Sequence, residues 1–171
     1  MPIPATQSPR RVAVTGYGAM CALGATADEI WQNIMAYRVG YKRYTLADPS
    51  ITARYFGFID EFGREQMRPF PKKTSKMLPL FAKYCLVATD EALRMAFGDA
   101  NLDDIASPFE RGVILGTGWG GLDTANANNN DYQQTGVATS FATVMSMCNA
   151  ATAGVTMNWN FRGVQNSPVA A

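Results

Sequence analysis

The chain has 171 residues, 47% of them hydrophobic and 17% charged, which is the composition of one soluble globular domain with material for a hydrophobic core. The formal net charge of +1 gives no electrostatic basis for binding nucleic acid or an anionic membrane surface. No apolar run reaches the ~18 residues of a membrane span, and Met1 to Pro4 do not begin a signal peptide, so a cytoplasmic location is expected.

The first predicted elements are a loose tail over residues 1–10 and a buried strand over residues 11–15. The strand is short and rich in β-branched side chains, and a turn with two glycines, Gly16 and Gly18, ends it. A helix is predicted next, because the residues from Thr26 to Glu29 form a capping box.

This helix is predicted to run to about Tyr37, with Ile30 and Ile34 on the same face as Tyr37, and Gly40 is expected to close it. Residues 41–78 are predicted to form a flap-like insertion of irregular structure, because three prolines and several aromatic side chains are scattered among charges there. The aromatic side chains of such an insertion need a surface to pack on.

The rest of the chain alternates between helix and strand patterns. In order, we predict a helix over residues 80–97, a strand over 112–115, a polar surface loop over 126–130, a buried helix over 145–159 and a strand over 164–171. This alternation predicts an α/β fold with a mostly parallel central sheet. Pro168 lies inside the last predicted strand, where it removes a hydrogen-bond donor from the ladder.

Two glycine motifs suggest nucleotide binding, but the residues around them do not complete the fingerprint. After Gly16 and Gly18, the next required glycine is replaced by Cys21. Residues 116–121 match the fingerprint literally, yet no strand ending in an acidic residue follows about twenty positions later. The alternative is that these glycines allow tight turns and close backbone approach. We therefore predict no cofactor.

Four motifs taken in order resemble the β-ketoacyl-[acyl carrier protein] synthases. They are the strand, turn and helix that begin at Arg11, the helix and its exit over residues 88–102, the glycine turn of residues 116–121, and Asn149 followed at a distance by Arg162-Gly163. The resemblance covers residues 11–171 and implies the thiolase-like fold, in which two similar halves form five αβαβα layers. The chain then corresponds to the N-terminal half, the αβα portion.

The resemblance also implies where the chemistry of the family lies. Its acyl-accepting cysteine would by register be the residue after Ala171, and its two later histidines have no counterpart because this chain contains no histidine. The cysteines that are present, Cys21, Cys85 and Cys148, form no metal-ligand pattern, fit a reduced compartment and lack a histidine base. We therefore predict no catalytic residue and no metal ligand here, and no condensation by this chain alone.

Two sets of binding residues follow from the same resemblance. Lys72, Lys73 and Lys76 match positions where basic residues dock the acidic acyl carrier protein, with a solvated charged surface as the alternative. A second set matches positions that line the acyl channel, with core packing as the alternative. This set consists of Trp119, Phe141 and Ala142. The family usually has a small aliphatic residue where Trp119 stands, so the preferred acyl-chain length is expected to differ.

Two classes of function remain open at this point. The chain is an N-terminal fragment of a condensing acyltransferase of fatty-acid or polyketide synthesis, or it is a non-catalytic module that binds a carrier protein or a synthase partner. In the family the helix that matches residues 145–159 is buried between the halves. We therefore expect self-association of this chain, as a dimer or a higher oligomer.

Overall fold

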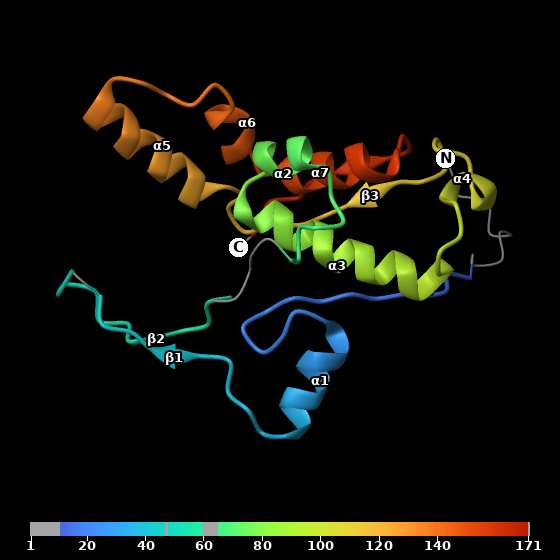
Figure 1. The fold of residues 1–171 in the computed structure, drawn as a ribbon, viewed down its shortest axis with the longest axis horizontal. Helices are drawn as coiled ribbons and strands as arrows, with labels where there is room; N and C mark the ends of the chain where they lie inside the picture. The colour runs from blue at the N-terminus through green and yellow to red at the C-terminus, as the bar shows by residue number, and fades with distance from the viewer. Residues whose placement is uncertain (1–10, 47, 60–64, 171) are drawn as a thin grey trace, which may run out of the picture.

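The structure is a computed structural model that describes residues 11–46, 48–59 and 65–170 (Figure 1). The predicted tail and part of the predicted insertion lie outside these residues. The helices are α1 (Ala27–Met35), α2 (Lys72–Met77), α3 (Leu80–Phe97), α4 (Leu102–Ile105), α5 (Leu122–Thr135), α6 (Ala142–Ser146) and α7 (Ala150–Trp159). The strands are β1 (Lys42–Arg43), β2 (Tyr55–Phe56), β3 (Val113–Ile114) and β4 (Gln165–Asn166).

The hydrophobic core lies between α3 and α7, which pack side by side (Figure 1). Leu86 of α3 and Val155 of α7 are fully buried. A Cβ at Gly154 would lie 3.0 Å from the side chain of Leu78, which precedes α3, and 3.6 Å from that of Leu86 on α3, so the glycine allows close packing of α7 on this region. Helix α3 has the predicted bounds, and Gly98 ends it with a positive φ of 60°.

Strands β3 and β4 pair in parallel, which confirms the parallel arrangement predicted for this part of the chain. Ile114 faces Asn166 in the ladder, and an isolated bridge in the same register joins Thr117 to Val169. Pro168 lies between these two contacts and has no N–H to donate, so the ladder is interrupted there as predicted.

The prediction of a buried strand over residues 11–15 is wrong. These residues belong to no ladder in the described part of the chain, and the side chains of Val12 and Val14 are 92% and 87% exposed. Their β-branched pattern favours extended backbone, but an extended segment becomes a strand only when a neighbouring strand accepts its hydrogen bonds.

Helix α3 holds the turn that follows this segment through close backbone contacts. A Cβ at Gly16 would lie 2.1 Å from the backbone oxygen of Ala92, and one at Gly18 would lie 2.0 Å from that of Ala88. Neither distance leaves space for any side chain. The structure therefore gives these glycines the packing role that was the alternative to nucleotide binding.

Helix α1 begins as predicted but ends earlier. Thr26 is its N-cap and accepts the Glu29 N–H at 3.2 Å, while the Glu29 carboxylate accepts the Ala25 N–H at 2.8 Å. The last helical residue is Met35, and Tyr37 takes a φ of 55°, so the predicted closure by Gly40 is wrong. The side chains of Ile34 and Tyr37 are exposed rather than packed on a face.

The predicted insertion contains an antiparallel pair of strands, β1 and β2. Its aromatic side chains pack on one another: the ring of Tyr44 meets that of Phe58 edge-on at 4.9 Å, and Phe56 stacks on Phe58 at 5.5 Å. The aromatic side chains of the insertion were expected to need a surface to pack on, and they provide it for one another. In Figure 1 this hairpin and α1 extend away from the α3–α7 core.

Two further predictions are wrong near the glycine turn of residues 116–121. The asparagine-rich loop over residues 126–130 is instead the middle of helix α5, which Gly136 closes in the left-handed region. Asparagine lowers helix propensity by only a fraction of a kcal/mol, and the Asn128 amide bonds back to the Thr124 carbonyl at 2.9 Å. The single helix over residues 145–159 is instead two helices, α6 and α7.

The glycine turn explains this second break. A Cβ at Gly121 would lie 2.1 Å from the Met145 backbone oxygen, and one at Gly120 would lie 2.8 Å from the Cys148 Cα. The Gly121 N–H also donates to the Ser146 carbonyl at 3.3 Å. Because the turn occupies this side of the α6–α7 junction, the backbone leaves helical geometry between Ser146 and Ala150.

Candidate functional site

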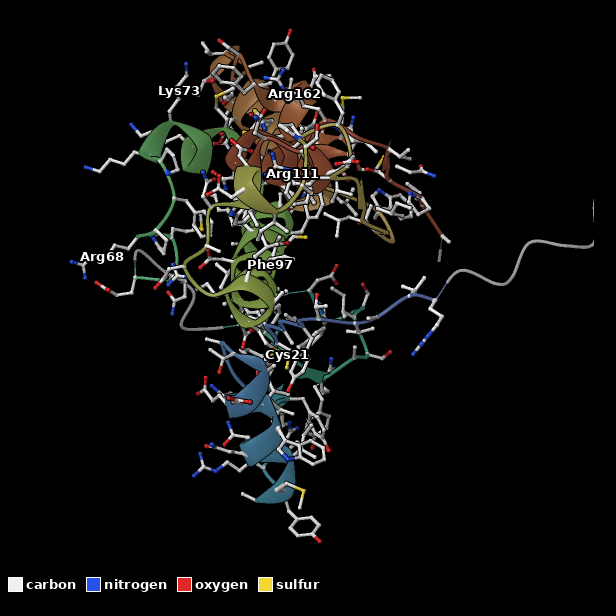
Figure 2. All side chains as sticks on the ribbon, turned by 90° about the vertical axis from the view of Figure 1, so that its right-hand side faces the viewer. Cys21, Arg68, Lys73, Phe97, Arg111 and Arg162 are labelled. Carbon is white, nitrogen blue, oxygen red and sulfur yellow. The ribbon has the colours of Figure 1, made fainter. Side chains whose placement is uncertain are left out.

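The predicted docking lysines lie on α2, a short helix on the surface. Lys72, Lys73 and Lys76 are all exposed, and Arg68 precedes them with a side chain that is exposed as well. Arg68 and Lys73 project from the same side of the molecule (Figure 2). The three lysines are thus exposed on one short helix, which we call the α2 basic surface, while Arg68 pairs with Glu65.

The position of these lysines does not favour the stability of their helix. Lys72 and Lys73 occupy the first turn of α2, where the helix dipole favours acidic side chains, and this turn contains no acidic residue. Pro71 before them makes no side-chain cap. A cation that opposes the dipole costs a few tenths of a kcal/mol, whereas Lys76 lies in the last turn, where the dipole favours a cation.

The predicted acyl-channel residues lie around the glycine turn and the start of α6. Trp119 is 71% exposed, Phe141 is the N-cap of α6 and also exposed, and Ala142 is half-buried. The contacts of Gly120 and Gly121 bring this turn against the end of α6. Core packing, the alternative for these residues, therefore does not describe Trp119 or Phe141.

The turn itself is rigid. The Thr117 hydroxyl accepts the Gly120 N–H at 3.0 Å, and Gly120 has a positive φ of 84°. Gly121 is buried and is the N-cap of α5. Of the three fingerprint glycines, Gly121 is thus committed to the α6–α7 junction, as is Gly120 beside it, whereas a Cβ at Gly118 would meet no atom within 4 Å.

The ends of β3 and β4 that approach this turn carry polar side chains. A cavity of about 280 Å³ is lined there by residues that include Asn149, Thr152 and Gln165. The hydroxyl of buried Thr152 lies 2.5 Å from that of Ser167, which ties α7 to the chain after β4. Neutral hydrogen-bonding groups of this kind can position backbone and side chains but offer no nucleophile paired with a base.

The three cysteines occupy different environments. Cys85 packs against the core, and burial raises the pKa of its thiol, although a hydrogen bond with Thr89 partly offsets the effect. Cys148 is half-buried at the α6–α7 junction. Cys21 is exposed in a tight turn, where its sulfur accepts the Leu23 N–H at 3.4 Å. Cys85 therefore has the packing role expected from its helical pattern.

Sequence reasoning missed the role of one residue that positions the N-terminal segment. The Glu91 carboxylate on α3 accepts the Ala19 N–H and the Ala27 N–H, each at 2.9 Å. These bonds join α3 to segments 72 and 64 residues away in the sequence. Helix α3 also carries Lys83, Asp90 and Arg94, so the sequence did not single out Glu91; its half-burial in the structure is what requires hydrogen-bond partners.

Within the described residues, no helix is both long enough and apolar enough to cross a membrane. The same part of the chain contains no group of three or more histidine, cysteine or acidic residues placed to hold a metal ion.

Comparisons with known proteins agree with the order of motifs. The family model of the β-ketoacyl synthase N-terminal domain matches residues 9–171. A 3-oxoacyl-[acyl-carrier-protein] synthase 2 of Synechocystis sp. is 29% identical over 168 residues, which cover 95% of this chain and 38% of the relative. This chain thus spans well under half the length of that relative.

Two solved structures are similar to the whole described fold. A β-ketoacyl synthase from Burkholderia phymatum superposes with a TM-score of 0.69 at 22% identity, over 90% of this chain and 38% of the other. A type II polyketide ketosynthase structure, which contains its acyl-carrier protein in complex, superposes with a TM-score of 0.67 at 17% identity, over 89% of this chain and 39% of the other.

Proposed function

Because the chain belongs to the β-ketoacyl synthase family, we propose that it forms the carrier-docking, N-terminal part of a condensing acyltransferase of fatty-acid or polyketide synthesis. In the complete reaction of the family, a cysteine accepts the acyl group and condenses it with a malonyl unit carried on the carrier protein. The present chain supplies scaffold and binding surface to that reaction. This assignment rests on the family match over residues 9–171.

The observation that carries the docking role is the α2 basic surface. Lys72, Lys73 and Lys76 are exposed on one short helix, and Lys72 and Lys73 lie in its first turn, where the dipole favours acidic side chains. One of the structural relatives is a ketosynthase in complex with an acyl-carrier protein. An acidic carrier protein is the partner whose charge complements this surface.

Trp119, Phe141 and Ala142 are proposed to line the mouth of the acyl channel. What supports this is their shared location at the contact between the glycine turn and α6, together with the exposure of the two aromatic side chains. An aromatic ring at position 119 narrows such a channel compared with a small aliphatic side chain. The preference of the complete enzyme then shifts toward shorter acyl chains.

The chain alone is proposed to be catalytically incompetent. It contains no histidine to stabilise the enolate that condensation requires. Of its cysteines, Cys85 packs against the core, where burial raises the pKa of its thiol, and Cys148 is half-buried. Cys21 is exposed, but no described histidine base accompanies it.

Replacing Lys72, Lys73 and Lys76 together with glutamate tests the docking proposal. An exposed ion pair contributes about 1 kcal/mol or less, so loss of all three weakens carrier-protein binding by up to about a hundred-fold. Affinity is measured by calorimetry with an acyl carrier protein at low and at physiological salt. The difference in carrier-protein affinity between the unmodified chain and the triple variant should shrink as the salt concentration rises.

A matched control changes the same amount of charge elsewhere. Arg11, Arg38 and Arg43 are exposed and lie before α2 in the sequence, so their joint replacement with glutamate alters net charge equally. Equal loss of affinity in both triple variants would show a general charge effect and remove the proposed surface. Condensation of malonyl-carrier protein by the purified chain would separately overturn its proposed incompetence.

A further inference from the structure

Strand β3 has a backbone edge that faces away from β4. Every second residue from Val113 to Thr117 donates its N–H to a carbonyl in or beside β4. Because alternate residues of a strand direct their backbone groups to opposite edges, those of Ile114 and Gly116 point the other way. No described residue pairs with that side, and both residues are exposed. We call this row of unpaired groups, over residues 112–116, the open β3 edge.

The segment of residues 11–15 lacks a partner in a complementary way. No backbone hydrogen bond joins it to the rest of the described chain, and Val12 and Val14 are 92% and 87% exposed. Its β-branched side chains favour an extended backbone. It contains five residues, as the open β3 edge does, so both span about 17 Å when extended. The chain therefore carries an unpaired strand and an unpaired edge of the same length.

Contacts with α3 hold the segment apart from the edge of its own chain. Directly after it, a Cβ at Gly16 would lie 2.1 Å from the Ala92 backbone oxygen, and the Glu91 carboxylate accepts the Ala19 N–H at 2.9 Å. Figure 1 shows the segment, in blue, well apart from β3. To align along its own edge, the segment would have to release these contacts with α3. A second copy can present its edge without any such loss.

Charges at the ends of the segment and the edge favour a parallel alignment. Arg11 begins the segment and Glu110 lies just before the open β3 edge; both are exposed, and neither forms an ion pair with another described residue. Parallel alignment brings these opposite charges to the same end. Antiparallel alignment would place Arg11 near residues 116–122, which contain no acidic side chain.

We propose that residues 11–15 of one copy add as a parallel strand to the open β3 edge of a second copy, which returns its own segment in exchange. The unpaired backbone groups of Ile114 and Gly116 then gain partners, and Val12 and Val14 lose contact with water. Each copy contributes both a strand and an edge, which doubles the contact toward the ~800 Å² per partner of stable interfaces. Both elements are used in each copy, so association stops at a two-fold dimer.

Hydrogen exchange of the unmodified 171-residue chain over a range of concentrations, with sedimentation alongside, tests the proposal. Protection of alternate amides in residues 11–15 and of the Ile114 and Gly116 amides should rise together at least about ten-fold as the dimer forms. Protection that does not depend on concentration would mean that the segment pairs within its own chain. A dimer without this protection would show a different interface. Either result, or a monomer at every concentration, would overturn the exchange.

Proline substitutions separate the exchange from folding. Ala13→Pro combined with Val14→Pro removes a donor whichever residues of the segment face the edge, and should raise the dissociation constant of the dimer at least about ten-fold. The substituted residues are exposed and make no backbone hydrogen bond within one chain, so the unfolding temperature of the dilute monomer should not change. The matched control combines Thr52→Pro with Ala53→Pro, at exposed residues that donate no backbone hydrogen bond. Equal dimer affinity in both double variants would overturn the proposal.

A charge variant tests the alignment. Glu110→Gln keeps a carbonyl that can accept the Ser107 N–H, as Glu110 does now at 3.0 Å, but removes the attraction for Arg11. Dimer affinity should fall about three-fold at low salt, since two exposed pairs are lost per dimer. Glu65→Gln is the matched control, because Glu65 is exposed and pairs only with Arg68. Affinity that is the same in Glu110→Gln and Glu65→Gln would overturn the parallel alignment.

Discussion

Glu91 shows how much of the tertiary structure depends on one side chain. It accepts two backbone N–H groups from the N-terminal segment, one of them at the first residue of α1. Hydrogen bonds to a charged group contribute about 1.5–3 kcal/mol each, more than an exposed ion pair does. The segment before α1 is therefore attached to the core chiefly through this carboxylate and the neighbouring glycines.

Replacement of Glu91 by alanine should lower the free energy of unfolding by about 3 kcal/mol or more, because two buried N–H groups lose their acceptor. Glu91→Gln keeps one carbonyl acceptor and should cost roughly half as much. Urea denaturation measures both. Glu65→Ala is the control, because Glu65 is exposed and only pairs with Arg68 at 3.8 Å. Equal losses for Glu91→Ala and Glu65→Ala would contradict the role of the carboxylate.

The burial of the Cys85 thiol predicts that the free energy of unfolding depends on pH. Burial raises the pKa of its thiol above the ordinary value of 9.0, so the folded chain binds this proton more tightly than the unfolded chain does. Its contribution is complete below about pH 9 and is lost as pH rises through the raised pKa. We expect the unfolding free energy to fall as pH rises above about 9, and to fall less in Cys85→Ala. Parallel pH profiles for the two proteins would contradict this.

At the scale of elements, the correct predictions rest on residues that act on the backbone next to them. Thr26 and Glu29 form the capping interaction that their spacing indicated, and Gly98 ends α3 as predicted. Pro168 interrupts the β4 ladder because a proline lacks an N–H in any context.

The predictions that failed depended on distant partners. Residues 11–15 have a strand pattern, but the described chain provides no neighbouring strand for them. The apolar run from Met145 to Trp159 looks continuous in sequence, and only the contact with Gly120 and Gly121 divides it. Helix α5 forms despite its asparagines, because a weak local preference is easily outweighed. A cavity of about 420 Å³ beside Arg111 could not be predicted, since it joins residues from three separate segments.

A pair of glycine variants tests the attachment of the N-terminal segment. Gly16→Ala should detach it from α3, because the new Cβ would lie 2.1 Å from the Ala92 backbone oxygen. We expect faster amide hydrogen exchange over residues 16–27 and a loss of stability of about 2 kcal/mol or more. Gly118→Ala is the matched control, since a Cβ there meets no atom within 4 Å. Unchanged exchange in Gly16→Ala would show that the contact is not formed in solution.

At the scale of the whole molecule, the family and its fold could be predicted because four motifs keep their order over the chain. The match of the family model and the solved ketosynthases confirm the thiolase-like α/β fold. The individual binding residues stay predictions, because exposure shows where a side chain lies and not what it binds. Exposed apolar side chains elsewhere in the chain nevertheless predict whether it associates in water.

Apolar side chains remain open on the outer face of the β3–β4 sheet and along the extended N-terminal segment. Ile114 is 66% exposed and Val164 lies beside it in the paired strands, while Val12 and Val14 are almost fully exposed. An exposed apolar patch of several hundred Å² is rare on a monomer and usually marks an interface. Helix α7, whose exposure was the reason to expect self-association, is instead largely buried against α3. We therefore expect any self-association to use the exposed side chains beside β3 and β4.

The energetics favour association. Burial of about 400 Å² of apolar surface per chain contributes on the order of 10 kcal/mol per chain at ~25 cal/mol per Å², from which the cost of association is subtracted. Analytical ultracentrifugation at micromolar concentration should therefore detect a dimer or a higher oligomer. Ile114→Lys should shift the equilibrium toward monomer, because the charge would be buried in the interface. Tyr37→Lys, at an exposed position after α1, should leave it unchanged. A well-folded monomer of the unmodified chain would mean that these side chains repack in solution to exclude water.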